Sequence, residues 1–349
     1  MKVLIILVTL MLVLPNYTVV NVKPINTSNT LKLTGDLYGD IVVWQEVNMS
    51  IIKSDRVTGI EVDEATDIVI HNLSTSEEWK IDEPGAQNVP RIYKDKIAYF
   101  DWTNRTRANL MLYDINTRRS DVLVNNLVLP GDMDIFEDRI VYAEGSKPKM
   151  EIWLYNITTG ENTLIASDKE KDCFKPRIYG DNIIYTKATV IKIPVEQVKE
   201  PSLMLYNIST KEEKEISKAY YIGGETIYKN NIAWCERPVE NESRIMLYNI
   251  TSGEKRRVPL QWNTFVEVSL YENILVFTGY VGRDSFGIGG LDILNSQYFP
   301  ISVLENAIVG FQLHIHGKRV IWTDYRNSPE PLNLHILQPN EIWSAEIRR

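Results

Sequence analysis

Histidine and acidic residues that could bind a metal ion occur at both ends of the sequence. His314 and His316 are separated by one residue, so on a β-strand both side chains point to the same side. Imidazole and carboxylate groups are common ligands of divalent metal ions. If Asp36 and Asp134 lie nearby, these residues could form the metal site of a polysaccharide lyase or hydrolase. The alternative is that both histidines occupy ordinary inner-strand positions, where other repeats carry arginine and tyrosine.

A set of polar and charged residues precedes a recurring aromatic residue by two positions. Its members are Asp36, Arg91, Asp134, Arg177, Thr226, Ser269 and His314. The first four alternate in sign, and an equivalent position in each repeat would bring them together. We interpret the set first as a charge-paired plug that satisfies strand ends, and alternatively as a ligand site at the mouth of a channel.

A second recurring position, four residues after the start of a β-branched segment, is mostly acidic. Its members are Gln45, Asp101, Glu144, Lys187, Glu236, Thr278 and Asp324. The simplest interpretation is a hydrogen bond to the backbone at the edge of a sheet. Residues 101–104 and 324–327 are predicted to extend this position into loops. There Trp102 and Tyr325 could stack on a sugar or on a partner side chain.

Other signatures of catalysis and of nucleic-acid binding are missing from the sequence. It has no Gly-x-Ser-x-Gly elbow and no second domain for a catalytic triad, so we expect no fused serine peptidase. It also has no Walker loop and no dinucleotide-binding fingerprint, and no cofactor is expected. The net charge of -8, without a basic stripe interleaved with aromatic residues, argues against a nucleic-acid partner.

The elements that must position these residues are repeated along the chain. A phrase related to Leu-Tyr-Asn-Ile-Thr-Thr-Gly-Glu occurs seven times. Its leading apolar residues are Ile70, Leu112, Leu154, Leu205, Leu247, Leu291 and Leu334. The steps between them lie between 42 and 51 residues, and a period of this size indicates a repeat architecture.

Each repeat also contains a short hairpin signal upstream of that phrase. An aromatic residue or histidine, a turn of Gly, Asp, Asn, Glu or Lys, a β-branched segment and a second aromatic residue follow one another, as from Tyr179 to Tyr185. Such turns join antiparallel strands. Seven four-stranded meanders stacked in a ring make an all-β, seven-bladed β-propeller over residues 31–349. Residues 19–30 are expected to be a linker or a closing strand, because blade 7 has a candidate last strand of its own at 341–347.

The N-terminal residues 1–18 are typical of an exported protein. Lys2 precedes an apolar run over residues 3–14, which suits a signal peptide and is short for a membrane span. We therefore expect a signal peptide or N-terminal anchor and a secreted or cell-surface location. Cys173 and Cys235 could then form a disulfide, although two cysteines are too few for a framework.

Nine Asn-x-Ser/Thr sequons also fit export. The glycosylation candidates are Asn48, Asn104, Asn156, Asn207 and Asn249. The sequons at Asn72, Asn156, Asn207 and Asn249 belong to the repeated phrase, where Asn, Ser and Thr are also favoured by turn geometry.

The Gly-Asp turn, the β-branched pair with its aromatic residue, and the Leu-Tyr-Asn-x-Ser/Thr-Thr-Gly-Glu phrase together resemble TolB-like propellers. These occur in exported proteins, including archaeal surface proteins. The resemblance covers roughly residues 31–349 and implies a scaffold that faces proteins or glycans, usually without catalysis. The sequence departs from full TolB proteins because it lacks their N-terminal α/β domain. Some similar propellers are part of enzymes, namely the propeller of prolyl oligopeptidases and a metal-binding oligogalacturonate lyase.

The sequence therefore predicts non-enzymatic binding of a protein partner or a cell-surface polysaccharide through one face of the ring. Insertions at 48–66 and 189–201, between the second and third strands of blades 1 and 4, would project from that face, where recognition loops are common. The candidate binding residues are Asp36, Arg91, Asp134, Arg177, His314, Asp101, Trp102, Asp324 and Tyr325. The rival prediction is a metal-dependent polysaccharide lyase or hydrolase that uses His314 and His316.

Overall fold

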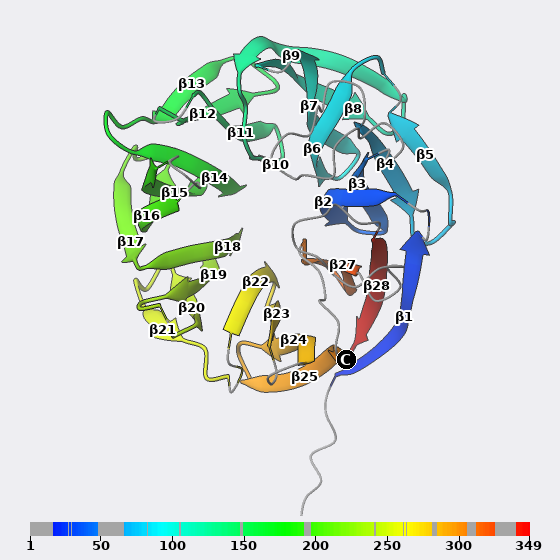
Figure 1. Cartoon of the computed structure of the whole chain (residues 1–349), viewed down its shortest axis with the longest axis vertical. Helices are drawn as coiled ribbons and strands as arrows, with labels where there is room; N and C mark the ends of the chain where they lie inside the picture. Colours follow the sequence, from blue (N-terminus) through cyan, green and yellow to red (C-terminus); the bar gives the residue numbers. More distant parts are fainter. Residues whose placement is uncertain are drawn as a thin grey trace, which may run out of the picture.

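Seven four-stranded antiparallel sheets form a ring in a computed structural model of the chain (Figure 1). This confirms the predicted all-β, seven-bladed propeller. The structure describes residues 17–26, 28, 30–47, 66–81, 83–104, 106–146, 149–191, 197–240, 242–260, 262, 264–280, 285–305, 312–324 and 340–349. Among these residues there is no helix, and so none long and apolar enough to cross a lipid bilayer.

Each of the first three blades is built from consecutive strands, with the inner strand first. The strands are β2 (Leu31–Tyr38), β3 (Ile41–Val47), β4 (Thr66–Asn72) and β5 (Glu78–Ile81) in blade 1; β6 (Ala86–Tyr93), β7 (Lys96–Asn104), β8 (Arg107–Asp114) and β9 (Arg119–Val128) in blade 2; β10 (Met133–Phe136), β11 (Arg139–Glu144), β12 (Glu151–Asn156) and β13 (Asn162–Ala166) in blade 3.

The next three blades follow the same order, and blade 7 combines both ends of the described chain. The strands are β14 (Asp172–Tyr179), β15 (Asn182–Ile191), β16 (Gln197–Asn207) and β17 (Glu213–Lys218) in blade 4; β18 (Tyr221–Tyr228), β19 (Asn231–Arg237), β20 (Arg244–Asn249) and β21 (Lys255–Arg257) in blade 5; β22 (Thr264–Tyr271), β23 (Ile274–Tyr280), β24 (Ser285–Asp292) and β25 (Gln297–Glu305) in blade 6; β26 (His314–His316), β27 (Arg319–Asp324), β28 (Glu341–Arg348) and β1 (Thr18–Asn26) in blade 7.

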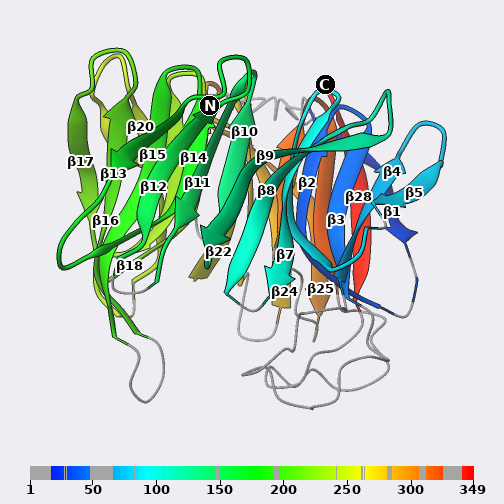
Figure 2. The same cartoon turned by 90° about the horizontal axis from the view of Figure 1, so that it is seen from above.

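The hairpin between the first two strands has the same backbone conformation in every blade. The first turn residue always has a positive φ, between 51° and 61°. These residues are Gly39, Lys94, Glu137, Gly180, Lys229, Glu272 and Gly317. A positive φ at this position matches the right-handed twist of the two strands. These hairpin turns and the turns between third and fourth strands lie on one side of the ring, along the top of Figure 2.

The turn between third and fourth strands is held by the side chain that ends the third strand. Asn156 Oδ1 accepts the Thr159 backbone N–H at 2.8 Å, and Asn249 Oδ1 accepts that of Ser252 at 2.9 Å. Asp114 makes the same contact to Thr117 at 2.8 Å in blade 2. Because Asp replaces Asn there, the repeated Asn is explained by backbone capping, whatever its state of glycosylation.

The core between blades is organised around the recurring aromatic residue of the second strand. These side chains are fully buried in all seven blades: Trp44, Tyr99, Tyr142, Tyr185, Trp234, Phe277 and Trp322. Each packs with β-branched and aliphatic residues of its own blade and of a neighbour. Burying one such side chain contributes about 1.5–3 kcal/mol, so the repeated aromatic position fixes the stacking of the blades.

The ring is closed by β1, which is the outer strand of blade 7 and pairs antiparallel with β28 (Figure 1). Tyr17 stacks on Phe299 of blade 6 with ring centroids 4.9 Å apart and donates a hydrogen bond to Asp292 Oδ2 at 2.7 Å. The prediction that residues 341–347 form the last strand of blade 7 is wrong, because they belong to β28, the third strand of the blade, and β1 is the fourth. The Leu-Tyr-Asn phrase was assigned in this blade to Leu334, which lies outside the described residues, whereas β28 itself lacks that phrase.

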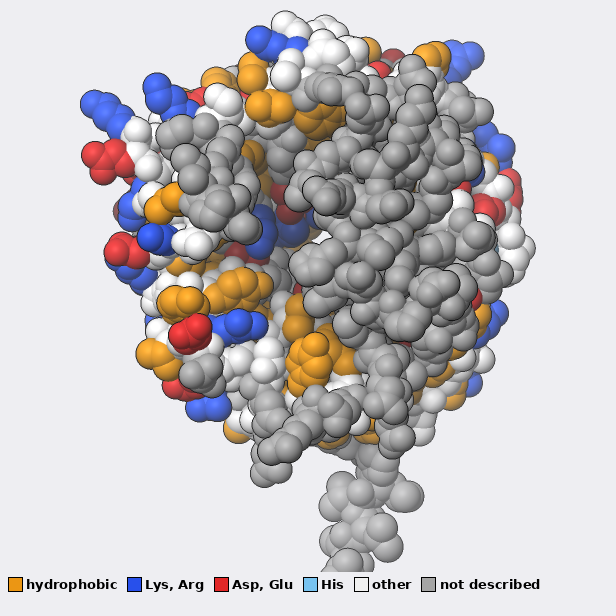
Figure 3. All heavy atoms as spheres, in the orientation of Figure 1, with side chains coloured by type: hydrophobic (Ala, Val, Ile, Leu, Met, Phe, Trp, Pro, Cys, Tyr) orange, Lys and Arg blue, Asp and Glu red, His pale blue; other side chains and the backbone are white. Residues whose placement is uncertain are grey.

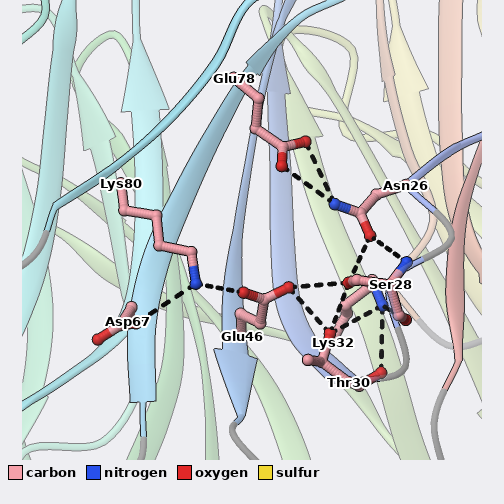
Figure 4. Close-up of polar contacts among 8 residues, drawn as sticks. All are labelled: Asn26, Ser28, Thr30, Lys32, Glu46, Asp67, Glu78 and Lys80. Atoms are coloured by element: carbon pink, nitrogen blue, oxygen red, sulfur yellow. Dashed lines mark hydrogen bonds and ion pairs between the residues drawn. The ribbon is translucent and has the colours of Figure 1, made fainter.

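Buried Lys32 joins blade 1 to the residue segments that follow β1 and precede β28 (Figure 4). Lys32 Nζ donates to the carbonyl oxygens of Ser28 at 2.9 Å and Asn340 at 2.7 Å. The Asn340 side chain accepts the Lys32 backbone N–H at 2.6 Å and donates to the Lys32 carbonyl at 3.0 Å. Burial lowers the pKa of Lys32 to about 8, against the attraction of Glu46. Residues 308 positions apart are thus tied together where blades 7 and 1 meet.

Several local predictions differ from the structure. Residues 101–104 belong to strand β7 and not to a loop. The insertion at 189–201 is largely an extension of the β15–β16 hairpin, in which Thr189 pairs with Lys199 and Ile191 with Gln197. Cys173 and Cys235 are free, buried thiols, so the disulfide is not formed. Residues 1–16, 48–65 and 325–339 lie outside the described residues, and with them the leader, the first insertion, Asn48 and Tyr325.

Candidate functional site

The inner strands of all seven blades line one central cavity of about 390 Å³. It contains every member of the predicted polar set: Asp36, Arg91, Asp134, Arg177, Thr226, Ser269 and His314. We call these residues the polar ring. The repeats therefore do bring the predicted residues together, and the cavity has the size of a small-ligand site.

The cavity is surrounded on the turn side by aromatic residues, one from the end of each inner strand. We call this set the aromatic collar: Tyr38, Tyr93, Phe136, Tyr179, Tyr228, Tyr271 and His316. Neighbouring ring centroids are between 4.1 and 5.2 Å apart around the complete circle. Burial raises the pKa of the tyrosine hydroxyls at Tyr38, Tyr93 and Tyr179. The collar is therefore a closed circle of contacting aromatic rings that lines the cavity and carries neutral phenols.

The two arginines of the polar ring are neutralised by an aspartate that the sequence analysis did not single out. Asp132 accepts Arg91 Nη2 and Arg177 Nη1, both at 2.9 Å, through its two carboxylate oxygens. Burial alone would raise the pKa of the Asp132 carboxyl, but Arg177 and Arg91 lower it to about 2. The predicted charge-paired arrangement is present, although its centre is Asp132 and not Asp36 or Asp134.

Asp36, Asp134 and Ser269 of the polar ring each join one blade to the next. Asp36 Oδ2 accepts the Ile92 backbone N–H at 2.9 Å, and Asp134 Oδ2 accepts that of Ile178 at 2.9 Å. Ser269 Oγ accepts the Ile315 backbone N–H at 3.2 Å in the same way. Burial raises the pKa of Asp134 to about 6. These side chains hold inner strands together, which fits the structural interpretation of the set.

His314 and His316 both lie on β26 but are used differently. His316 Nδ1 accepts the Gly39 backbone N–H at 2.9 Å, and its ring lies in the collar between Tyr38 and Tyr271. His314 Nδ1 is 3.3 Å from Asp36 Oδ1, and burial lowers the pKa of His314 to about 4. Within the described part of the chain, no group of three or more His, Cys, Asp or Glu side chains is arranged to hold a metal ion. These residues therefore do not fit the metal site considered above.

A further layer, on the far side of the polar ring from the collar, was missed by the sequence analysis. It contains Asp132, Lys175, Gly224, Glu267 and Gln312. Lys175, Gly224 and Gln312 have positive φ values of 54°, 63° and 71°. Lys175 in β14 and Gly224 in β18 each lie in a β-bulge, where the pairing register shifts. Pro90 and Pro176, each inside an inner strand, were the available signal, since proline within a strand often marks a bulge.

Charge is distributed unevenly around this cavity. Blades 2 to 4 supply three cations, Arg91, Lys175 and Arg177, and two carboxylates, Asp132 and Asp134. Blades 5, 6 and 1 supply only carboxylates, at Glu225, Glu267 and Asp36. Glu225 accepts the Thr186 hydroxyl at 2.6 Å, and Glu267 Oε2 accepts the Leu313 backbone N–H at 2.9 Å. One half of the channel is therefore acidic.

The comparisons with known proteins place this geometry in a common fold. No protein-family model and no curated protein sequence matches the chain. An acylaminoacyl peptidase complex is similar with a TM-score of 0.65 and 13% identity, over 92% of this chain and 52% of that chain. The propeller domain of the trilobed protease from Pyrococcus furiosus, with an open velcro topology, has a TM-score of 0.62, with 12% identity over 91% and 94% of the two chains.

An oligogalacturonate lyase in complex with manganese has a TM-score of 0.57, with 13% identity over 93% of this chain and 98% of that chain. TolB from Acinetobacter baumannii is also matched, with a TM-score of 0.49. These likenesses establish the fold alone. The chain spans about half the length of the acylaminoacyl peptidase. The finer resemblance to archaeal surface propellers stays a prediction.

The predicted acidic position of the second strand needs a correction in two blades. Strand pairing makes Glu46, and not Gln45, the equivalent of Asp101, Glu236 and Asp324. By the same register Gly279 replaces Thr278. The error arose because the β-branched runs of blades 1 and 6 begin one residue earlier relative to the hairpin turn.

These second-strand acids make internal contacts. Glu236 and Asp324 accept the indole N–H groups of Trp234 and Trp322 at 2.8 and 3.1 Å. Asp101 accepts Gln87 Nε2 at 3.1 Å, and burial raises its pKa. Trp102 packs against the core between blades 2 and 3. A hydrogen-bonding role at the blade edge is therefore present, but these three contacts are with side chains and not with the predicted backbone groups. Glu144 makes the predicted type of contact, since it accepts the Val128 backbone N–H at 2.8 Å.

The side of the ring opposite the tight turns carries exposed apolar residues. Figure 3 looks onto this side and shows Lys, Arg, Asp and Glu side chains set back at its centre, with hydrophobic side chains on the described rim. Tyr220 and Val239 of blade 5 are 58% and 59% exposed. The Tyr220 backbone N–H donates to the carbonyl of Arg237 at 2.9 Å. Val239 is two residues after Arg237, so Tyr220 and Val239 lie at the same corner of the blade. Exposed aromatic and aliphatic residues at one corner of a blade are available for contact with a partner.

Proposed function

We propose that the protein is a non-enzymatic β-propeller scaffold that acts outside the cytoplasm and binds a protein partner or a cell-surface polysaccharide. The observation that carries this proposal is the use of the polar ring. Its carboxylates and the Ser269 hydroxyl accept backbone N–H groups of adjacent blades, and the His314 imidazole lies 3.3 Å from Asp36. Groups committed in this way are suited to shaping a rigid binding cavity, whereas a catalytic acid or base must be able to exchange protons with a substrate.

The binding surface is proposed on the side opposite the tight turns. The connections between second and third strands emerge there, and so does the corner formed by Tyr220 and Val239. Recognition residues commonly lie on connections that a rigid scaffold positions. Export, a leader that ends before Tyr17, and glycosylation at Asn104 belong to the same proposal, and they rest on the sequence patterns. The leader is placed before Tyr17 because Tyr17 packs on Phe299 and β1 begins at Thr18.

The alternative of a metal-dependent polysaccharide lyase receives less support from the described residues. A solved lyase shares the fold at 13% identity, which carries no information about the site. His316 Nδ1 already accepts a backbone N–H, and its ring is packed within the collar. A metal ion bound by His314 and His316 would require His316 to lose its hydrogen bond from Gly39 and its packing in the collar.

We expect immobilised protein to retain a specific component of a cell-surface extract, and Tyr220→Ser combined with Val239→Ser to weaken that retention at least about tenfold, as for residues central to an interface. The matched control is Leu294→Ser, which alters a 70% exposed apolar residue on a turn of the opposite side. Protease treatment of the extract distinguishes a protein from a polysaccharide. Equal retention by the double variant and the control would contradict the proposed surface.

A further inference from the structure

We infer that β1 and its flanking residues Tyr17, Ser28 and Thr30, here called the strap, form an acid-sensitive fastening of the ring. At acidic pH the strap leaves blade 7, whereas the other blades stay folded. The strap belongs to the closure of the ring, so its release is independent of the proposed function.

β1 contributes few buried side chains to the ring. No residue of β1 itself is buried, whereas most residues of its neighbour β28 are. The pairing of β1 with β28 shifts register twice, between Val20 and Lys23 and between Pro24 and Asn26. Pro24 also has no backbone N–H to donate to the ladder. Side-chain contacts of the strap therefore contribute a large part of its attachment.

Within the described part of the chain, the side-chain hydrogen bonds that the strap donates to the ring end on carboxylates of blades 6, 7 and 1. They run from Tyr17 to Asp292 at 2.7 Å, from Asn21 to Glu346 at 3.2 Å, from Asn26 to Glu78 at 3.2 Å, from Ser28 to Glu46 at 3.1 Å and from Thr30 to Glu46 at 2.9 Å. Figure 4 shows the contacts with Glu78 and Glu46. An ionised carboxylate accepts hydrogen bonds at both oxygens and more strongly than a neutral group. The strap is thus fastened by neutral donors to negative charge.

Other charged and titratable groups surround these acceptors. They are Lys80, Asp67, Lys32 and Glu341 around Glu46, His71 beside Glu78, Arg348, Arg319 and Asp40 around Glu346, and Glu272, Lys318 and Arg349 around Asp292. The cations favour the ionised form of the carboxylates that hold the strap.

The pKa values of these carboxyls define when the fastening weakens. Burial alone would raise the pKa of Asp292, but the hydrogen bond from Tyr17 lowers it. Burial is also opposed at Glu46, where Lys80 and Thr30 lower the pKa, and Arg348 lowers that of Glu346. A carboxylate with a lowered pKa in the folded protein stabilises it above the pKa of the unfolded state, which is about 4. This contribution is lost as the pH falls through the folded pKa, so the strap weakens below about pH 4.

The channel responds to acid in a different way. Burial raises the pKa of Asp134 to about 6 and also raises that of Glu267, so protonation of these groups favours the fold as the pH falls. Asp132 keeps its charge down to about pH 2. The acid-sensitive groups of the channel are His314 and His316, whose pKa values are lowered by burial, and both lie in blade 7. Acid therefore weakens the ring first at blade 7, where the strap is attached.

Release of the strap changes the surface of the ring. It uncovers Phe299, which is buried beneath Tyr17, and the backbone groups of β28 that pair with β1. An uncovered strand edge is able to pair with another strand. The acidic form therefore has an open edge that the neutral form lacks.

The test is amide hydrogen exchange of the full chain between about pH 6 and about pH 3.5, corrected for the pH dependence of the intrinsic exchange rate and measured by mass spectrometry. We expect the protection of the β1 amides to fall at least about tenfold over this range. Protection of β19 in blade 5 should change by less than about twofold. Hydrogen exchange thus separates release of the strap from unfolding of the ring.

The combined variant Asp292→Asn, Glu46→Gln and Glu346→Gln keeps the shape of the acceptors but removes their charge. At about pH 6 its β1 amides should exchange as fast as those of the wild type at about pH 3.5, and their protection should no longer depend on pH. If this variant does not fold, Asp292→Asn alone should speed the exchange of β1 at about pH 6 and reduce its pH dependence.

The matched control is Asp121→Asn, Glu215→Gln and Glu254→Gln, which removes the same charge from exposed positions in blades 2, 4 and 5. It should keep the wild-type pH profile, since exposed charges at a distance are screened. Loss of protection in β1 and β19 at the same pH in the wild type would overturn the inference, because the acid effect would then be global unfolding. Constant protection of β1, or a wild-type pH profile in the charge-free strap variants, would overturn it as well.

Discussion

Replacing Asp132 by alanine is expected to lower the free energy of unfolding by about 3 kcal/mol, because it leaves two guanidinium groups in the channel without a counter-charge. Arg91 is only 7% exposed, so its charge has little access to water. Asp132 also accepts the Met133 backbone N–H at 2.9 Å, and the variant loses this contact too. Urea denaturation at neutral pH measures the effect, with Asp121→Asn as a control that should change stability by less than about 0.5 kcal/mol.

The same variant provides a pH test with a defined sign. The Asp132 carboxyl has a pKa of about 2 in the folded protein and about 3.9 when unfolded. Because the pKa is lower in the folded protein, the Asp132 charge stabilises the fold at pH values above the pKa of the unfolded state. This contribution is lost as the pH falls through the pKa of the folded state. The difference between wild type and Asp132→Ala should therefore be full above about pH 4 and shrink towards pH 2. A difference that does not depend on pH would show that Asp132 does not act through its charge.

Removing β1 is expected to have the second large effect. A variant that begins at Leu31 loses the outer strand of blade 7, the Tyr17 contacts with Phe299 and Asp292, and the Ser28 carbonyl that accepts Lys32. We expect a loss of about 5 kcal/mol or more, which is comparable to the whole stability of many domains. The unpaired edge of β28 should also promote aggregation.

Strand complementation makes this prediction specific. A synthetic peptide of residues 17–30 should restore the thermal transition of the shortened protein by adding a strand to β28. The same peptide with Tyr17→Ala should restore it less, because it lacks the stacking on Phe299 and the hydrogen bond to Asp292. If the shortened protein is as stable as the longer one, closure through β1 does not hold the ring.

The repeat pattern was sufficient to predict the propeller, because seven copies of a turn and an aromatic position constrain the same sheet seven times. The pattern also identified the polar ring, since residues two positions before the aromatic residue share its side of a strand. It failed at blade 7, where β28 lacks the Leu-Tyr-Asn phrase and a Leu at position 334 took its place. Pairing between β28 and β1 is a contact between the chain ends that local patterns do not encode.

The charge partners inside the channel could not be predicted for a different reason. Asp132 precedes strand β10, and Lys175 lies in a bulge that interrupts the period of two. The alternating signs of the polar ring therefore predicted that Asp36 and Asp134 pair with the arginines, although these carboxylates accept backbone N–H groups of the next blade. Register errors at Gln45 and Thr278 likewise hid Glu46, which the structure places against Lys80, Thr30 and Ser28 (Figure 4).

The most direct test of a non-enzymatic scaffold is the metal content of the purified protein, measured together with turnover of acidic polysaccharides. Wild type and His314→Ala should be compared after purification without chelators. We predict less than stoichiometric metal in both proteins and no release of unsaturated or reducing sugar ends. One equivalent of metal per chain in the wild type, lost together with turnover in His314→Ala, would contradict the account and establish the channel as an active site.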